Sequence, residues 1–181
     1  IEACGLGFDE IQFDYIRYPD TSHSNLAYKE ESTFNNRTRN INSFLDEATE
    51  ILHGEGCLVS ADIFGYVLQT KSDNGIGQHL ESIVQSVDFI SPMVYPSHYS
   101  NGSFGYQYPN KYPYEVISAA LNDGLSRGIE IKQLRPYLQG FWHTTEDVRL
   151  NIKAAEDMGL DWIIWNNSSM YDANYFTKIE S

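Results

Sequence analysis

Two aspartates lie within apolar runs that have the character of β-strands. Asp14 is in the run EIQFDYI, and Asp62 is in the run CLVSADIF. Two carboxyl groups in one cleft tend to separate their pKa values, so that one is ionised while the other keeps a proton as a general acid. Held roughly 5–10 Å apart, such a pair hydrolyses glycosidic bonds. We therefore predict Asp14 and Asp62 as catalytic residues; alternatively, each aspartate caps the loop or helix that follows it.

A second group of side chains is predicted to bind substrate around this pair. Arg17 follows Asp14 by three residues and is expected either to orient that carboxylate or to form a surface ion pair. At the end of the last apolar run, Trp165 is predicted as an aromatic platform or a core residue, and Asn166 as a hydrogen-bond partner of a sugar hydroxyl. The full set predicted to bind substrate is Arg17, Tyr95, His98, Tyr137, Gln139, Trp165 and Asn166.

The longest predicted loop, Tyr95–Tyr114, contains six tyrosines and His98. Long loops after a strand usually carry function, and tyrosine stacks on sugar rings while keeping a wet edge. We predict a substrate-stacking rim, with a self-packed loop as the alternative. For His98 we weigh a sugar contact, a proton shuttle and a metal ligand against an ordinary loop histidine.

Five short apolar runs are predicted as strands, separated by four helical patterns. The strands are Glu10–Ile16, Cys57–Phe64, Val87–Tyr95, Lys132–Gln139 and Asp161–Asn166. The helices are expected over about 36–53, with the apolar stripe Ile41, Phe44, Leu45, Ala48, Ile51 and Leu52, then over 77–86, from Pro113 to about Gly128, and from Thr144 or Thr145 to Gly159. This alternation implies a parallel sheet with right-handed crossovers.

Within the strands, polar and apolar residues alternate, and the polar ones share a parity. Because successive side chains of a strand face opposite ways, one set meets the helices and the other lines an interior. We predict that the interior set is Gln12, Asp14, Ser60, Asp62, Ser91, Met93, Tyr95, Arg135, Tyr137 and Gln139, whereas Tyr15 belongs to the helix-facing set and Glu10 is solvated. A polar interior near the carboxyl ends of the strands is where parallel βα-barrels hold their active sites.

The fold class predicted from these elements is α/β, a parallel (β/α) barrel of the TIM type. A closed barrel has eight strands and about 250 residues, whereas this chain has 181 residues and five predicted strands. The first residues, IEACGLG, have the character of a helix end. We therefore expect residues 1–181 to form a single barrel domain that covers strands four to eight and lacks the N-terminal strands. A five-stranded doubly wound sheet is the alternative, and exposed edges would favour self-association.

Composition narrows the class of partner. The formal net charge is −13 and the sequence pI is about 4.6, which disfavours nucleic acid and anionic membrane surfaces. No apolar run reaches the roughly 20 residues of a membrane span. A neutral or cationic substrate is therefore expected, and the localisation stays open, with the extracellular space or the cell envelope as candidates.

Motifs for bound groups are missing from the sequence. There is no Gly-rich phosphate loop, no Cys/His zinc spacing and no GxSxG elbow, so no cofactor and no metal are expected. Gly75 and Gly77 are interpreted as ordinary loop glycines. Cys4 and Cys57 are predicted as two free buried thiols rather than a disulfide or a metal pair, because one pair is no disulfide framework.

The segments GFDEIQFDYIRYP, VSADIFGY, ISPMVYPSHY, LRPYLQGF and WIIWNNSSMY together resemble a family of bacterial and archaeal glycoside hydrolases. This family was first known as a domain of unknown function and is distantly related to the amylase-like barrels. The resemblance implies a (β/α)₈ barrel in which Asp14, after strand four, is the nucleophile and Asp62, after strand five, is the proton donor. Two positions depart from the amylase pattern: the donor there is usually Glu, and Gln139 and Gly140 stand where a third acid is found.

We therefore expect a glycoside hydrolase that cleaves a polysaccharide with the carboxylates of Asp14 and Asp62. One alternative is a non-catalytic carbohydrate-binding barrel that keeps the cleft without the chemistry. The other is a metal-dependent hydrolase, in which Asp14, Asp62 and His98 would hold the metal.

Overall fold

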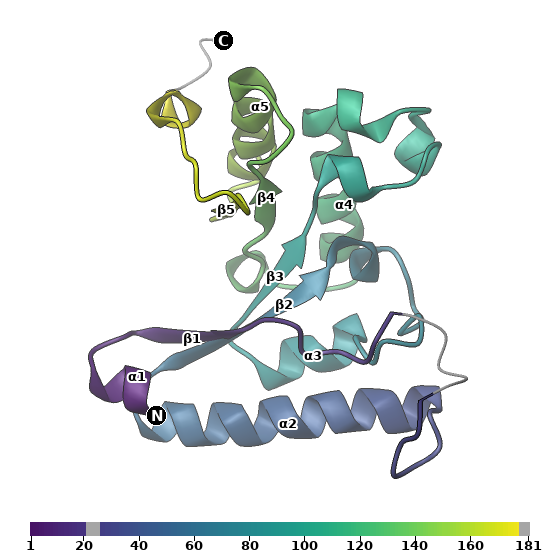
Figure 1. Cartoon of the computed structure of the whole chain (residues 1–181), viewed down its shortest axis with the longest axis vertical. Helices are drawn as coiled ribbons and strands as arrows, with labels where there is room; N and C mark the ends of the chain where they lie inside the picture. The colour runs from purple at the N-terminus through teal and green to yellow at the C-terminus, as the bar shows by residue number, and fades with distance from the viewer. Residues whose placement is uncertain (21–25, 178–181) are drawn as a thin grey trace. The chain divides into compact units, whose positions relative to one another are not determined.

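The computed structural model describes residues 1–20 and 26–177. By its internal contacts the chain divides into two compact units, residues 1–90 and residues from 91 onward. Each unit alternates strands with helices (Figure 1). The strand order follows the chain order, β1-β2-β3-β4-β5, with β3 running through the division between the units.

The first unit is built on two parallel strands backed by a long helix. Its elements are α1 (Glu2–Gly5), β1 (Glu10–Phe13), α2 (Phe34–Gly54), β2 (Leu58–Phe64), the 3₁₀ turn η2 (Gly65–Leu68), α3 (Leu80–Ser86) and the start of β3 (Phe89–Met93). In Figure 1, α2 runs along the length of β1 and β2, and α3 packs beside it. The parallel ladder joins Glu10 to Leu58 and ends with Phe13 opposite Ala61.

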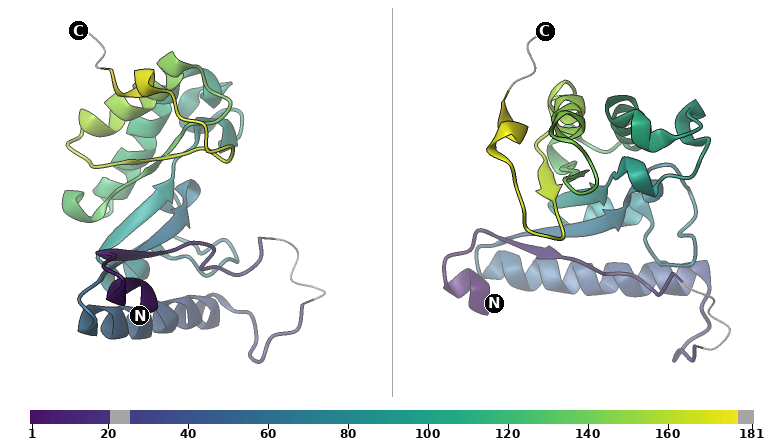
Figure 2. Two further views of the ribbon diagram at one scale, coloured as in Figure 1. Left: turned by 60° about the vertical axis from the view of Figure 1, so that its left-hand side comes forward. Right: turned by 45° about the horizontal axis from the view of Figure 1, so that its top comes forward.

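The second unit contains three parallel strands and two longer helices. Its elements after β3 are η3 (Pro96–His98), η4 (Ser103–Gly105), η5 (Pro109–Lys111), α4 (Pro113–Ser126), η6 (Ile131–Gln133), β4 (Tyr137–Gln139), α5 (Thr145–Glu156), β5 (Ile163–Trp165) and η7 (Ala173–Phe176). Helices α4 and α5 lie side by side (Figure 2). Tyr137 of β4 pairs with Met93 of β3 on one side and with Ile163 of β5 on the other.

Each predicted strand contains an observed strand, but the observed strands are shorter. In β1 the ladder stops before Tyr15, whose φ of +58° turns the chain away from extended geometry. In β4 the first predicted residues belong to η6, and Pro136, which has no N–H to give to a ladder, comes directly before the strand. The prediction that Tyr15 faces the helices is wrong, because the residue follows the end of the strand and is 75% exposed.

The sequence also accounts for the ends of the main helices. In α2 the Thr33 side chain accepts a hydrogen bond from Asn36 N at 3.2 Å, and in α5 Thr144 and Asp147 form a capping box. Only part of the predicted stripe of α2 is buried: Leu45 is fully enclosed, whereas Phe44 and Ile51 are each 44% exposed. The apolar surface of α2 is therefore broader than the surface it buries in the first unit.

The predicted division of β1 and β2 into two faces is confirmed by contacts on each side. On the apolar face the ring of Phe13 meets that of Phe44 of α2, with centroids 5.2 Å apart. On the polar face Ser60 Oγ donates to Glu10 Oε1 at 2.5 Å. The expectation that Glu10 is solvated is therefore wrong, because the strand pairing brings its carboxylate to the Ser60 hydroxyl.

Cys4 and Cys57 form a disulfide, with their Cα atoms 5.9 Å apart. The prediction of two free thiols is wrong. The bond joins the short helix α1 to the residue before β2, across 53 positions of sequence. The spacing alone carries no sign of this proximity, which arises because the polypeptide before β1 packs beside the start of the neighbouring strand.

Within the described residues, no helix combines the length and the apolar character needed to cross a lipid bilayer.

Candidate active site at the strand ends

Asp14 and Asp62 lie at matching positions of neighbouring strands. Phe13 and Ala61 are the last residues that pair β1 with β2, and each aspartate is the next residue along the chain; Asp14 follows β1, whereas Asp62 lies within β2, which continues to Phe64. Asp14 is exposed and its Oδ1 accepts a hydrogen bond from Tyr15 N at 2.7 Å, whereas Asp62 is only 6% exposed. One carboxyl group in water and one in a buried setting are the two environments that acid–base pairs of this kind use.

Arg17 lies beside these strand ends and contacts aromatic rings. Its guanidinium is 4.9 Å from the ring centroid of Phe64 and 5.5 Å from that of Tyr15. The same group pairs with Asp20 at 3.7 Å and donates to Tyr18 O at 3.2 Å. Arg17 therefore links the turn after β1 to the end of β2 by a cation–π contact.

In the second unit, aromatic side chains gather after β3 and β4. The ring of Tyr95 meets those of His98 and Phe141 edge to face, with centroids 5.3 and 5.2 Å away. Tyr95 is only 5% exposed, so it forms the buried part of this cluster. Burial lowers the pKa of His98, and at neutral pH its ring is therefore the uncharged form.

Trp142 is the exposed member of this cluster, and the sequence analysis did not select it. Its side chain is 77% exposed, and its φ of +54° is unusual for a residue with a large side chain. The indole lies edge to face with Phe141 at 5.1 Å and near His98 at 6.4 Å. The available signal was its position, three residues after the end of β4, within the segment GFWHTT.

His143, the next residue, is fixed from both sides. Its Nε2 lies 2.8 Å from Asn110 Oδ1, and its Nδ1 lies 3.1 Å from Asn151 Nδ2. Asn151 also donates to Gln139 O at 2.8 Å. Burial lowers the pKa of His143, partly offset by the charge of Asp147. A neutral ring with its proton on Nε2 satisfies both contacts, so the residues flanking Trp142 are anchored while its own ring faces water.

Gln139 and Asn166, predicted to bind sugar, use their amides within the protein. Gln139 Oε1 accepts from Ser97 N and Ser97 Oγ at 3.1 and 3.0 Å, and its Nε2 donates to Phe141 O at 2.8 Å. Asn166 Nδ2 donates to Gly140 O and Met170 O, and its Oδ1 accepts from Ser168 N. These two amides position the loops that carry the aromatic residues.

Tyr137, the first residue of β4, lies next to Trp165, the last residue of β5. Their rings meet edge to face with centroids 6.4 Å apart, and Trp165 is 46% exposed. The long loop between β3 and α4 is partly packed on itself, since Tyr106 stacks on Tyr112 at 4.4 Å and Tyr99 meets Phe104 at 5.0 Å. Tyr108 and Tyr112 keep 51% and 42% of their surface exposed, which leaves aromatic surface on this loop for a ligand.

The first unit thus brings Asp14, Asp62 and Arg17 to the point where the pairing of β1 with β2 ends. The second unit gathers Tyr95, His98 and Gln139 around one aromatic cluster and sets Tyr137, Trp165 and Asn166 beside it. In the described ranges 1–20 and 26–177, no group of three or more His, Cys, Asp or Glu side chains is arranged to hold a metal ion.

Known proteins share this fold. The chain is similar to the glycoside hydrolase domain of PgaB (BpsB) from Bordetella bronchiseptica, with a TM-score of 0.61 and 18% identity over 88% of this chain and 52% of that one. It therefore spans about half the length of that domain, and the fold is that of part of a TIM-type glycoside hydrolase barrel. This confirms the predicted fold class.

A second similar structure is catalytic domain 2 of the Ostrinia furnacalis Group II chitinase, a mutant in complex with penta-N-acetylchitooctaose. Its TM-score is 0.44 and its identity 15%, over 75% of this chain and 35% of that one. No curated protein matches the chain. A family model described as "putative glycosyl hydrolase domain" matches residues 1–171. The chain belongs to this glycosyl hydrolase family.

Proposed function

We propose that this protein is a glycoside hydrolase that cleaves a polysaccharide with the carboxyl groups of Asp14 and Asp62. The observation that carries the proposal is the pairing of Phe13 with Ala61, which sets the two aspartates one residue beyond the end of the same ladder. Neighbouring strands lie about 4.8 Å apart, so side chains at such positions fall within the separation that glycosidic carboxyl pairs use.

The two carboxyl groups differ in a way that suits two roles. Asp14 is exposed and accepts a hydrogen bond from Tyr15 N, so its carboxyl group is oriented and accessible, as a nucleophile or electrostatic stabiliser needs. Asp62 is enclosed, as a general acid that gives its proton to the leaving oxygen needs to be. Membership of the glycosyl hydrolase family and the barrel fold support these roles.

Sugar binding is assigned to the second unit. The cluster of Tyr95 and His98 follows β3, and Trp165 is the last residue of β5; the carboxyl ends of such strands are the active face of a parallel barrel. Tyr137, the first residue of β4, contacts Trp165. Aromatic rings stack on the apolar faces of sugar rings, and Trp142 adds the most exposed ring. Gln139 and Asn166 support this surface through the loops they hold.

The charge of the chain restricts the glycan. With a net charge of −13, the chain repels polyanions within the Debye length of the solution. We infer that the polysaccharide is neutral or cationic rather than a polyuronate.

The test uses the full-length protein against starch, xylan, β-glucan and chitosan, with alginate as the anionic comparison, and measures release of reducing ends. Asp14→Asn and Asp62→Asn each replace a carboxyl group by an amide of nearly the same volume that does not ionise. Each is expected to lower kcat by about 100-fold or more, because such carboxyl groups act directly on the reacting bond. Asp161→Asn, an exposed aspartate ahead of β5, is the matched control and is expected to keep wild-type activity.

Three outcomes would contradict the proposal. If hydrolysis is unchanged in Asp14→Asn, the carboxyl pair is not the catalytic device. If the protein retains chitosan or starch on affinity electrophoresis but hydrolyses none of the panel, a non-catalytic binding barrel is the better description. A loss of activity in EDTA that added metal restores would favour a metal-dependent hydrolase.

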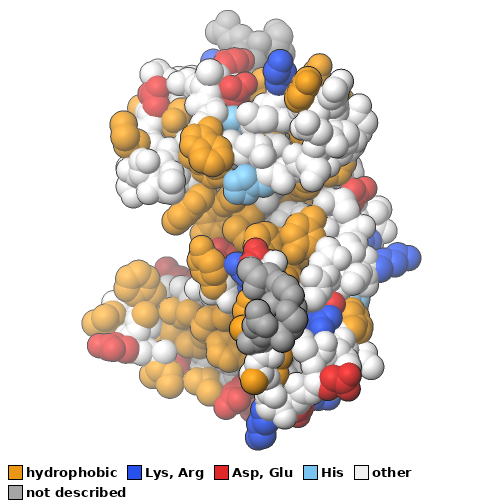
Figure 3. Space-filling model, turned by 45° about the vertical axis from the view of Figure 1, so that its right-hand side comes forward, with side chains coloured by type: hydrophobic (Ala, Val, Ile, Leu, Met, Phe, Trp, Pro, Cys, Tyr) orange, Lys and Arg blue, Asp and Glu red, His pale blue; other side chains and the backbone are white. Residues whose placement is uncertain are grey.

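We also propose that copies of this chain associate through the apolar side of the first unit. Hydrophobic side chains gather over much of this unit in the space-filling view (Figure 3). Leu6 and Phe8 are 76% and 63% exposed, and Phe44 and Ile51 of α2 are also partly uncovered. Apolar surface of this kind favours association with another copy of the chain.

A further inference from the structure

Gln78, a residue with no role in the sequence analysis, joins the segments that carry the two aspartates. It lies just ahead of α3 and is 1% exposed. Its Nε2 donates to Asp62 O at 3.1 Å and to Ile16 O at 3.3 Å, and its Oε1 accepts from Phe64 N at 3.0 Å. Both N–H groups and the carbonyl oxygen of the amide are thus engaged, and the exchanged orientation would set donor against donor and oxygen against oxygen.

These contacts lie where the sheet no longer connects the two strands. The ladder of β1 and β2 ends at Phe13 and Ala61, and each aspartate comes after it. Gln78 then bonds the backbone of Asp62 itself and of Ile16, two residues beyond Asp14. It continues the cross-link between the strands past the last ladder position, at the height of the carboxyl groups.

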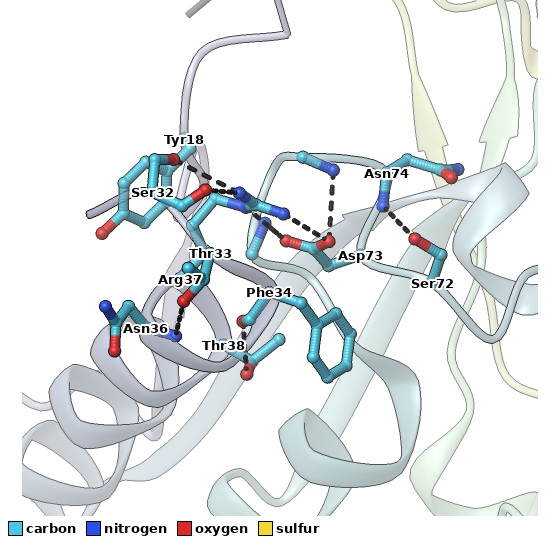
Figure 4. Close-up of polar contacts among 12 residues, drawn as sticks. Tyr18, Ser32, Thr33, Phe34, Asn36, Arg37, Thr38, Ser72, Asp73 and Asn74 are labelled. Carbon is cyan, nitrogen blue, oxygen red and sulfur yellow. Dashed lines mark hydrogen bonds and ion pairs between the residues drawn. The ribbon is translucent and has the colours of Figure 1, made fainter.

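The backbone at Gln78 is held in place by the loop before it. Asp73 is 1% exposed, and its carboxylate accepts from Gly75 N at 3.2 Å and from Gly77 N at 2.9 Å. Arg37 of α2 binds the same carboxylate with two nitrogens, at 2.6 and 2.9 Å (Figure 4). The loop is therefore anchored to a long helix by a buried bidentate ion pair.

Gly77 lets this loop approach the helix and the end of β1 closely. Its φ is +80°, and a Cβ atom there would lie 2.8 Å from Ile41 Cγ1 and 3.1 Å from Arg37 O. The interpretation of Gly77 as an ordinary loop glycine is wrong. Nearby, Tyr18 N donates to Ile76 O at 2.7 Å, a second link between this loop and the segment after Asp14.

We infer that Gln78 is a positioning residue for the carboxyl pair, fixing the separation of Asp14 and Asp62 through the backbone. The inference rests on the proposed function. A buried amide with all its hydrogen-bonding groups engaged holds its partners in one arrangement, since breaking any of these bonds leaves a buried polar group unsatisfied. Reaction rates in such sites respond to displacements of an ångström.

Two substitutions in the full-length protein test this role on the polysaccharide of the panel that the wild type hydrolyses fastest. Gln78→Met keeps the volume and removes every hydrogen bond, whereas Gln78→Glu keeps an acceptor for Phe64 N and removes the donors in its ionised form. Both are expected to lower kcat about 10- to 100-fold while KM changes less than about twofold. Gln85→Met, on the exposed side of α3, is the matched control and is expected to match the wild type.

A positioning role also predicts how the effect of Gln78→Met depends on Asp62. In an Asp62→Asn background the carboxyl pair no longer acts, so Gln78→Met is expected to lower the residual kcat less than about twofold. Loss of folded protein would lower both backgrounds by the same factor, and circular dichroism melting shows whether each variant is folded during the assay. Should Gln78→Met fail to fold, the same comparison with Gln78→Glu decides.

A folded variant with wild-type kcat, or an equal loss in the Asp62→Asn background, would overturn the inference. Failure of the proposed function gives a different result. In that case Asp14→Asn and Asp62→Asn are themselves fully active, whatever Gln78 does.

Discussion

Asp14 and Asp62 each directly follow the last position at which the parallel strands β1 and β2 pair with each other, so that register rather than sequence distance relates them. Asp14 and Asp62 are 48 positions apart in the sequence, yet the pairing of Phe13 with Ala61 sets the two aspartates level. The same relationship makes the backbone beyond the last ladder position, and the amide of Gln78 that bonds to it, part of the site's geometry.

Trp142 is expected to contribute to binding of the glycan and not to the bond-breaking step. Replacing it by alanine removes the stacking surface, so KM for the best polysaccharide of the panel should rise about 10-fold with kcat nearly unchanged, whereas Trp142→Phe should retain most of the affinity. Tyr171→Ala is a control, since Tyr171 is 52% exposed. An unchanged KM in Trp142→Ala would remove this residue from the sugar-binding surface.

The Arg37–Asp73 pair is expected to stabilise the first unit. Its side chains are 12% and 2% exposed, so Arg37→Ala leaves a carboxylate buried and should lower the free energy of unfolding by about 3 kcal/mol in urea titrations. Arg39→Ala breaks the neighbouring pair with Glu30, whose side chains are about half exposed, and should cost less than about 1 kcal/mol. Equal losses for the two variants would contradict the assignment of Arg37 to a buried anchor.

The pair also predicts a dependence of stability on pH. Burial by itself raises the pKa of Asp73. Hydrogen bonds from Arg37, Gly75 and Gly77 and the charge of Arg37 together lower it by more, so the pKa lies below its ordinary value. This stabilisation is therefore complete above the unfolded carboxyl pKa of about 3.9 and is lost as pH falls through the folded pKa. The stability difference between wild type and Asp73→Asn should accordingly shrink below about pH 4, as measured by urea unfolding at several pH values.

The disulfide between Cys4 and Cys57 is expected to stabilise the chain by restricting the unfolded state. It closes a loop of 53 positions, and loops of this size correspond to about 4 kcal/mol in the chain-entropy description. Cys4→Ser with Cys57→Ser should lower the melting temperature in non-reducing buffer. Adding a reductant should lower the melting temperature of the wild type in the same way, whereas it should not change the melting temperature of the double variant. Identical melting of the wild type with and without reductant would contradict this prediction.

Self-association is expected to depend on the apolar side of the first unit. Phe44→Glu with Ile51→Glu places charge on two partly exposed positions of α2 and should shift sedimentation toward a single monomeric species at concentrations where the wild type forms larger ones. Ile131→Glu, at a residue 53% exposed in the second unit, is the control. A monomeric wild type at all concentrations would contradict association by this surface.

The sequence by itself determined the alternation of strands and helices and the two faces of β1 and β2. These properties depend on local periodicity: a strand repeats every two residues and a helix every 3.6, so Val59, Ala61 and Ile63 identify a buried face without any partner in view. The motif around Asp14 and the position of Asp62 followed from the same alternation. The fold class was predictable for this reason, whereas the glycosyl hydrolase family was predicted from the resemblance of the segments around these strands to that family.

Only the tertiary structure decided which distant groups meet. Four contacts join residues more than 30 positions apart: the Cys4–Cys57 bond, the contact of Ser60 with Glu10, the buried Arg37–Asp73 pair and the bond of Gln78 to Ile16 O. For side-chain amides such as those of Gln139 and Asn166, the sequence gives the residue type but not whether the amide binds sugar or backbone. Their hydrogen bonds depend on how loops close after the strands, and local periodicity does not encode that closure.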